Sequence, residues 1–170
     1  MCTAIDADTF SYFCNSDSAL YSDFQPVRDW IENTNCKIVY GGSDYKNHLD
    51  KHRKFLGYLT EQERKGKTEH LDNEEVDRVT DVLKRNYTRE DFNDHHIVAI
   101  VLVSRCKLVC SIDRGLKNLI DKCYSSGRTT IKHQLRIMNV RKPHIYSGIS
   151  SAPTIRSRTS SDNCGPCSHT

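Results

Sequence analysis

The stretch DFNDHHIVAIVLVSRCKLVCSIDRGL, residues 91–116, decides the fold class of this chain. Its first apolar run, residues 97–103, predicts a buried helix, and Asp94 stands just before that run. Its second run, residues 107–112, is short and predicts a buried strand, and Asp113 follows directly. A carboxylate therefore stands at each junction, one before a helix and one after a strand.

The same alternation of short apolar runs and helical periodicity continues outward in both directions. Strands are predicted at residues 3–5, 36–42, 67–71, 107–112 and 142–146. Helices are predicted over residues 23–32, over a long segment that Ser43 caps and that runs through residue 59, over 72–87, where Asp72 gives a capping-box-like start, over 94–103 and 130–138, and around residues 116–120. Alternating strands and helices need crossover connections, so the sequence predicts a three-layer α/β/α sandwich with a mostly parallel central sheet.

Length and composition predict one domain over residues 1–147 and a flexible tail over residues 148–170, where Ser, Thr and Arg dominate. The mean hydropathy is −0.65, and no apolar run approaches the roughly 20 residues of a membrane helix. The first ten residues lack the basic and apolar regions of a secretory signal, which favours the cytoplasm. The eight cysteines then indicate reduced, mostly buried side chains.

Charge is unevenly distributed along the chain. Residues 1–122 carry 18 Lys and Arg against 21 Asp and Glu, a net −3, whereas residues 123–170 carry 7 against 1, a net +6. A basic end on a mildly acidic body is compatible with a nucleic-acid partner. A solvated tail would have the same composition.

Three aspartates are expected to gather at one edge of the sheet. Asp6 ends the first strand and Asp113 ends the fourth, and functional groups of an open parallel sheet lie beyond the carboxyl ends of its strands. Asp94 joins them if its helix start returns to that edge. Clustered carboxylates repel, and a divalent cation such as Mg²⁺ or Mn²⁺ relieves the repulsion. The simpler alternatives are that Asp94 and Asp113 cap helices and that Asp6 is a turn residue.

Several segments together resemble PIN domains, the fold of VapC-like toxins and other metal-dependent ribonucleases. TAIDADTF resembles their opening strand, and VYGGSDYKNHL resembles the segment that usually carries their second acid. NDHHIVAI resembles their acid before an apolar helix, and KLVCSIDRGL resembles their last core strand with its Ser/Thr-x-Asp turn. The resemblance covers about residues 1–122, with KPHIY as the expected last strand.

The resemblance implies a nuclease site. Asp6, Asp94 and Asp113 fall on three acidic positions of the family, Asp8 falls on the supporting polar position, and Ser111 falls on the hydroxyl position near the last acid. The aspartates would hold one or two Mg²⁺ or Mn²⁺ ions, and one ion would activate the attacking water.

One position departs from the family pattern. The remaining acid, usually a glutamate before a leucine, falls on His48, with Asn47 beside it. Either His48 or Asn47 takes a metal-facing role, or Asp44 substitutes one turn earlier, or the site is weakened. Because histidine suits Mn²⁺ better than Mg²⁺, an active site would prefer Mn²⁺.

Basic residues supply candidates for nucleic-acid binding. Arg114 and Lys117 flank Asp113 and would meet a phosphate, although a solvated helix face has the same pattern. The basic run over residues 49–67 would guide a phosphate backbone, and a wet helix face is again the simpler alternative. Cys164 and Cys167 form a CxxC motif in the tail, where zinc is possible but a loose tail is the default.

The sequence thus favours a single-domain endoribonuclease, with RNA favoured over DNA as the partner. A homodimer or an inhibitory partner protein is possible, and no membrane partner is expected. A second hypothesis is a PIN fold whose site has degraded into a nucleic-acid or protein-binding module. A third is a phosphatase-like hydrolase or a receiver domain, which also clusters acids on a parallel sheet.

Overall fold

The computed structural model describes residues 2–88, 93–125 and 143–147, and these form an α/β fold around one parallel sheet. All recorded strand pairs are parallel, and the strand order is β3-β2-β1-β4-β5. The strands are β1 (Cys2–Ile5), β2 (Lys37–Tyr40), β3 (Thr68–His70), β4 (Leu108–Cys110) and β5 (His144–Tyr146). The five strands predicted from the sequence are confirmed, including the last one at an edge of the sheet.

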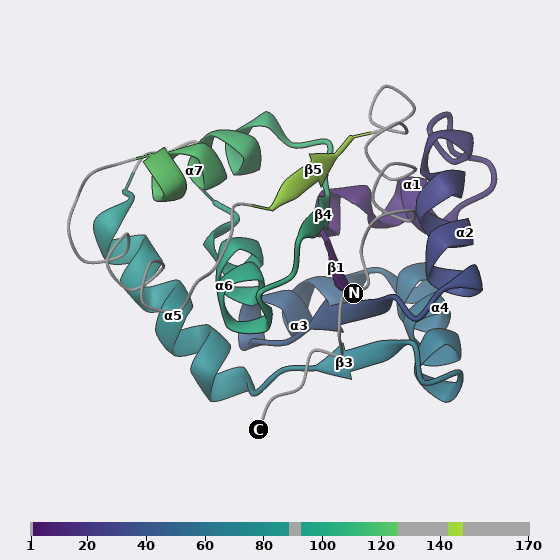
Figure 1. The fold of residues 1–170 in the computed structure, drawn as a ribbon, viewed down its shortest axis with the longest axis horizontal. Helices are drawn as coiled ribbons and strands as arrows, with labels where there is room; N and C mark the ends of the chain where they lie inside the picture. The colour runs from purple at the N-terminus through teal and green to yellow at the C-terminus, as the bar shows by residue number, and fades with distance from the viewer. Residues whose placement is uncertain (1, 89–92, 126–142, 148–170) are drawn as a thin grey trace.

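Helices cover both faces of the sheet. They are α1 (Phe10–Cys14), α2 (Gln25–Asn33), α3 (Ser43–Lys51), α4 (Arg53–Arg64), α5 (Asn73–Asn86), α6 (His95–Ser104) and α7 (Arg114–Ser125), with short 3-10 turns η1 (Ala7–Thr9) and η2 (Ser22–Phe24). Figure 1 shows α5, α6 and α7 on one side of the strands and α1, α2 and α4 on the other. The predicted three-layer α/β/α arrangement is therefore confirmed. The helix predicted over residues 130–138 and the tail over 148–170 lie outside the described residues.

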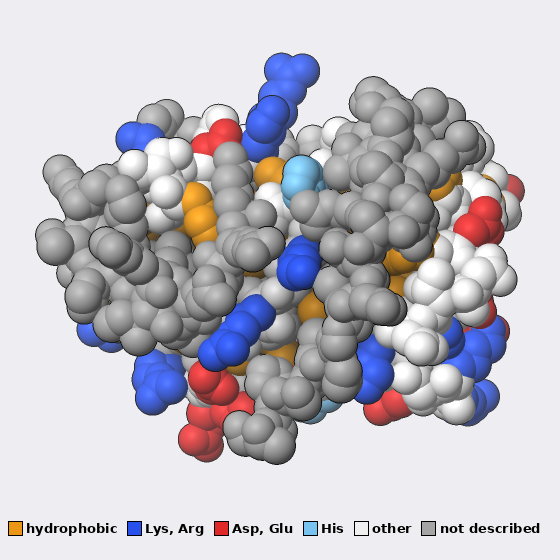
Figure 2. All heavy atoms as spheres, viewed as in Figure 1, with side chains coloured by type: hydrophobic (Ala, Val, Ile, Leu, Met, Phe, Trp, Pro, Cys, Tyr) orange, Lys and Arg blue, Asp and Glu red, His pale blue; other side chains and the backbone are white. Residues whose placement is uncertain are grey.

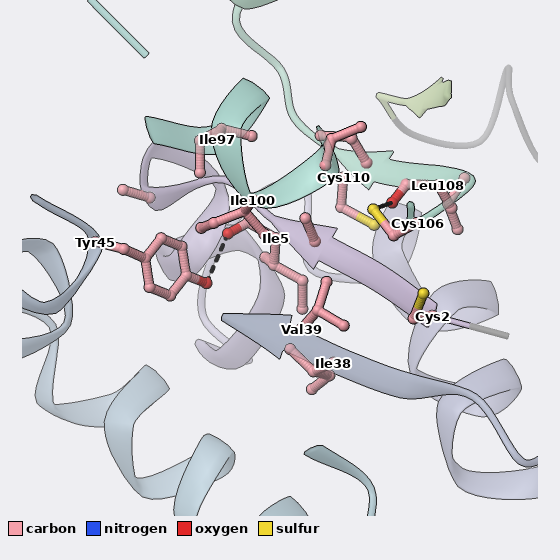
Figure 3. Packing of buried hydrophobic residues seen from close by; sticks show 14 of the residues in the cluster. Cys2, Ile5, Ile38, Val39, Tyr45, Ile97, Ile100, Cys106, Leu108 and Cys110 are labelled. Atoms are coloured by element: carbon pink, nitrogen blue, oxygen red, sulfur yellow. Dashed lines mark hydrogen bonds between the residues drawn. The ribbon is translucent and has the colours of Figure 1, made fainter. Parts of the chain in front are cut away.

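The core includes the central strands, α6 and apolar residues of the helices on the other face of the sheet. Every residue of β1 and β4 is buried, and α6 is buried around almost its whole circumference. Such a helix is apolar on all sides because protein surrounds it. Tyr45 reaches into this core and donates its hydroxyl to the carbonyl of Ile5, at 2.8 Å (Figure 3). The end of β1 is thus held by a side chain from α3.

The structure corrects the prediction of one long helix beginning at Ser43. The helix is divided at His52, whose φ of −118° and ψ of 70° are not helical. The division lets two aromatic rings from the two halves meet one ring of α1. Phe10 contacts Tyr45 of α3 edge-on at 5.7 Å between ring centroids and stacks on Phe55 of α4 at 3.8 Å.

The amino end of α3 is capped from another helix. Ser43 is the first residue of α3, and Gly42 occupies the capping position with a φ of 84°. Asp77 of α5 accepts hydrogen bonds from the Ser43 backbone N–H at 2.8 Å and from its hydroxyl at 2.6 Å. The prediction that Ser43 itself caps the helix is wrong, because its hydroxyl donates to Asp77.

Replacing Asp77 with alanine is expected to lower the free energy of unfolding by about 1 kcal/mol, the usual cost of losing a helix cap. Urea unfolding measures this change. Asp81→Ala, at an exposed position of the same helix, is the matched control and should change stability much less. Equal losses in the two variants would mean that the contact with Ser43 does not stabilise the fold.

The surface shown in Figure 2 carries Lys, Arg, Asp and Glu side chains, with hydrophobic side chains visible only in small areas between them. Among the described residues, no helix is both long enough and apolar enough to span a bilayer. None of the six described cysteines forms a disulfide, and five of them are buried, as the sequence predicts for small apolar core residues. Cys14 is the partly exposed one.

Candidate active site

The acidic residues gather where the chain changes direction across the sheet. From β1 the chain builds β2 and β3 on one side, then crosses back to place β4 on the other side of β1. Ligands of open parallel sheets bind outside the carboxyl ends of strands at such a switch point. Asp6 follows β1, and Ser111 follows β4, and the Asp6 backbone N–H donates to the Cys110 carbonyl at 2.9 Å.

Asp6 is fully buried with one oxygen free. Its Oδ2 accepts a hydrogen bond from the Ser111 hydroxyl at 2.6 Å. Its Oδ1 is buried and has no hydrogen-bond partner among the described residues. Burial raises the pKa of Asp6 to about 6, and the charges of Asp8 and Asp113 add to the rise, while the Ser111 hydrogen bond opposes it. A buried carboxylate with an unused oxygen is costly unless something binds it.

Asp113 is fixed by backbone groups. Its Oδ1 accepts the Gly115 N–H at 3.0 Å and its Oδ2 accepts the Leu116 N–H at 2.6 Å, so it caps α7. The Asp113 N–H in turn donates to the Ser111 hydroxyl oxygen at 3.0 Å. Ser111 therefore links Asp113 to Asp6. The helix-capping alternative is confirmed for Asp113, and it does not remove the residue from the acidic cluster.

Asp94 behaves differently. It precedes α6, yet its side chain makes no capping hydrogen bond, so the simpler interpretation as a helix cap is wrong here. Its Oδ2 is buried without a partner among the described residues. Burial, the charge of Asp6 and a hydrogen bond with the Asp113 carboxyl raise the pKa of Asp94 to about 8. At neutral pH the Asp94 carboxyl group is therefore largely protonated.

Asp8 completes the cluster from the solvent side. Its side chain is exposed on η1, and its charge contributes to the raised pKa values of both Asp6 and Asp94. Within the described part of the chain, none of Asp6, Asp8, Asp94 or Asp113 forms an ion pair with a basic side chain. The structure thus brings together four aspartates from three segments without a basic partner for any of them among the described residues.

The donor chemistry of this cluster fits a hard divalent cation. Among the described residues, no group of three or more His, Cys, Asp or Glu side chains is placed so that it could hold a metal ion. Mg²⁺, however, commonly takes one or two carboxylates and keeps several waters. The two buried oxygens without partners, Oδ1 of Asp6 and Oδ2 of Asp94, are suited to that mode of binding.

The candidates for the fourth acid lie in a separate group. His48 stacks face to face on His96, with ring centroids 5.2 Å apart. Asp44 pairs with Lys84 of α5 at 2.9 Å, which lowers the pKa of Asp44. The Asn47 side chain is exposed. The sequence did not connect Lys84 with Asp44, because the two residues are 40 positions apart and lie on different helices.

The two histidines after Asp94 have different environments. His95 contacts the Tyr87 carbonyl through Nε2 at 2.8 Å, a structural interaction. His96 is buried, and its Nε2 has no partner among the described residues. Burial, aided by the nearby His48, lowers the pKa of His96 to about 4. His96 therefore stays neutral at physiological pH.

Two further features bear on the edge of the site. Arg114 and Lys117 have exposed side chains on the first turn of α7, next to Asp113.

Thr9 was not singled out from the sequence: its N–H donates to the Asp6 carbonyl at 3.0 Å, and its hydroxyl is buried without a partner among the described residues. Only its position three residues after Asp6 would have drawn attention to it. Cys164 and Cys167 lie outside the described residues.

Comparison of the chain with protein-family models, with curated protein sequences and with solved structures finds no match.

Proposed function

We propose that this protein is a divalent-metal-dependent phosphodiester hydrolase, a single-domain endoribonuclease of the kind its resemblance to PIN domains implies. The observation that carries the proposal is the cluster of Asp6, Asp8, Asp94 and Asp113 at the switch point of a parallel sheet, in which the pKa values of Asp6 and Asp94 are raised. Among the described residues, no basic side chain forms an ion pair with any of the four. Carboxyl groups with raised pKa values gathered at such a position favour a cation-binding site over a purely structural role.

Each aspartate has a distinct role in this proposal. A Mg²⁺ or Mn²⁺ ion held by Asp6, Asp94 and Asp113 would activate a water and stabilise negative charge on the phosphate. Ser111 orients Asp6 by occupying its Oδ2, which leaves Oδ1 for the ion. The amino end of α7 holds Asp113 in place. Asp94 must release its proton before it can bind a cation.

The substrate is proposed to be RNA rather than DNA, on the strength of the resemblance. Arg114 and Lys117 would hold its phosphates, because their exposed side chains flank the acidic cluster. The six cysteines of the described part form no disulfide, which supports a reducing compartment such as the cytoplasm.

Cleavage of labelled single-stranded RNA and DNA by the purified protein tests the proposal. Reactions contain Mg²⁺, Mn²⁺ or EDTA, and the control is the double variant Asp6→Asn/Asp113→Asn. We expect metal-dependent cutting of RNA that EDTA and the control both abolish. Faster cutting in Mn²⁺ would indicate that His48 helps hold the ion, and equal rates in both metals would contradict that role.

Absence of cutting with either metal at high enzyme concentration would favour the alternative, a binding module with a degraded site. The face-to-face packing of His48 on His96 at the position of the usual acid supports this alternative. The variant His48→Glu then tests whether the site is a degraded nuclease site. Such a site should regain RNA cleavage when the acid is restored, whereas a protein that never cleaved RNA should stay inactive. The receiver-domain hypothesis is disfavoured because receivers have the strand order 2-1-3-4-5 and this sheet has the order 3-2-1-4-5.

A further inference from the structure

A second feature lies beside the acidic cluster, at the break between α3 and α4. A cavity of about 410 Å³ opens there. Its lining comes from α1 and from the α3–α4 junction, and comprises Phe10, Ser11, Asn15, Asp50, Lys51, His52, Arg53, Lys54 and Phe55. We call this feature the junction cavity. Neither the proposed catalytic residues nor Arg114 and Lys117 belong to it.

The junction cavity is positively charged. Its lining holds three cationic side chains, Lys51, Arg53 and Lys54, against one carboxylate, Asp50, so the Lys, Arg and Asp side chains sum to a charge of +2. Lys54 is fixed at the cavity by donating to the Asn15 side-chain oxygen at 2.8 Å. Lys51 and Arg53 are exposed, and neither forms an ion pair with a side chain of the described residues. They are thus available to an anion.

Two local features make this charge suited to a nucleotide chain. The aromatic floor is rigid, because Phe10 stacks on Phe55 at 3.8 Å and contacts the His52 ring edge-on at 5.4 Å. The half-exposed His52 ring gives a surface on which a base can stack. In addition, no side chain caps the amino end of α4, whose first residue is Arg53, and that end of a helix favours negative charge.

A short stretch of chain connects the acidic cluster to the junction cavity. From Asp6 the chain passes through η1, which carries Asp8, directly into α1, whose Ser11 and Asn15 line the cavity. Tyr45 joins the two places through the core, since its hydroxyl binds the Ile5 carbonyl and its ring contacts Phe10. A strand bound at the cavity would therefore lead toward the aspartates.

We propose that the junction cavity binds the phosphodiester backbone of a single-stranded nucleic acid, with Lys51 and Arg53 as its phosphate contacts. The inference rests on the proposed function for its choice of ligand. It assigns the strand a path along α1 and the α3–α4 junction on the side of Asp8. The sequence alone could not distinguish the basic run over residues 49–67 from a solvated helix face. The proposal gives two residues of that run, Lys51 and Arg53, a phosphate ligand at the junction cavity.

The test measures binding without cleavage. Fluorescence anisotropy with labelled single-stranded RNA and DNA of one sequence, in EDTA, compares the full chain with Lys51→Ala/Arg53→Ala. The matched control is Arg78→Ala/Arg85→Ala, which removes the same charge from exposed positions of α5. We expect the junction variant to lose roughly tenfold in affinity for any sequence and the control to lose less than about twofold. The slope of log K against log salt should fall by about 1.4, or about 0.7 for each lost phosphate contact.

Three results would overturn the inference: no binding by the unmodified protein, unchanged affinity in the junction variant, or equal losses in the two variants. A labelled mononucleotide is the second probe, and an affinity for it equal to that for the strand would contradict a backbone path. Because the readout contains no metal, it separates the two proposals. Junction-dependent binding without cleavage in Mg²⁺ or Mn²⁺ would retain this inference and reject the nuclease.

Discussion

Replacing Asp94 with asparagine is expected to stabilise the metal-free protein at pH 8 and to abolish cleavage. The folded-state pKa of Asp94, about 8, lies above the ordinary value of 3.8. The folded protein therefore binds a proton more tightly than the unfolded chain does. The stability gained from this proton is complete below about pH 4 and is lost as the pH rises toward 8. Asparagine removes the titration and can donate its amide N–H to Asp113.

The size of the stabilisation by Asp94→Asn follows from the difference between the folded-state pKa of Asp94 and its ordinary value. Each pKa unit corresponds to about 1.4 kcal/mol, so a gain on the order of 2 to 5 kcal/mol at pH 8 is expected, or several degrees in Tm. Thermal unfolding in EDTA at pH 5 and pH 8 measures it, with Asp81→Asn at an exposed position as the control. The gain should be small at pH 5. Cleavage should fall at least a hundredfold, and a variant that still cuts RNA would remove Asp94 from the site.

The affinity for Mg²⁺ or Mn²⁺ is expected to depend steeply on pH. A cation that binds both Asp6 and Asp94 must displace their protons, whose pKa values are about 6 and about 8. Between pH 8 and pH 6 only Asp94 is protonated, so affinity falls about tenfold per unit. Below pH 6 both are protonated, and the fall becomes about a hundredfold per unit. From pH 8 to pH 5 the loss is roughly ten-thousandfold.

Calorimetric titration with MgCl₂ or MnCl₂ at pH 5, 6, 7 and 8 measures this dependence. Histidine titrates in the same pH range, so His48→Gln is the control. That variant should keep the two-stage slope, because the protons belong to carboxyl groups. A loss of less than tenfold over the whole range, or a slope that disappears in His48→Gln, would show that the aspartates do not hold the ion in the proposed way.

The sequence by itself predicted the alternation of strands and helices, although it missed the short helix α1 and the division between α3 and α4, and the reason for its success is local. Buried strands such as residues 108–110 are short apolar runs, and amphipathic helices such as residues 73–86 show apolar residues at helical spacing. The capping of α5 by Asp72, which accepts the Glu75 N–H at 2.8 Å, is also a local contact that the residue order reveals. The alternation of strands and helices also predicted a parallel sheet. In such a sheet the carboxyl ends of the strands lie at one edge, so the sequence predicted that Asp6 and Asp113 lie at the same edge.

Only the tertiary structure decided how each polar side chain is used. Asp94 and Asp113 have the same pattern before a helix, yet Asp113 caps its helix and Asp94 does not. The sequence offered Asp44 as a candidate for the fourth acid, and only the tertiary structure shows that Asp44 forms an ion pair with Lys84 of another helix. The helix from Ser43 divides at His52, and rings from both halves meet Phe10 of α1, a residue more than 30 positions away in the sequence. Periodicity records which face of a segment is buried, whereas hydrogen bonds, ion pairs and raised pKa values depend on residues that are distant in sequence and meet only after folding.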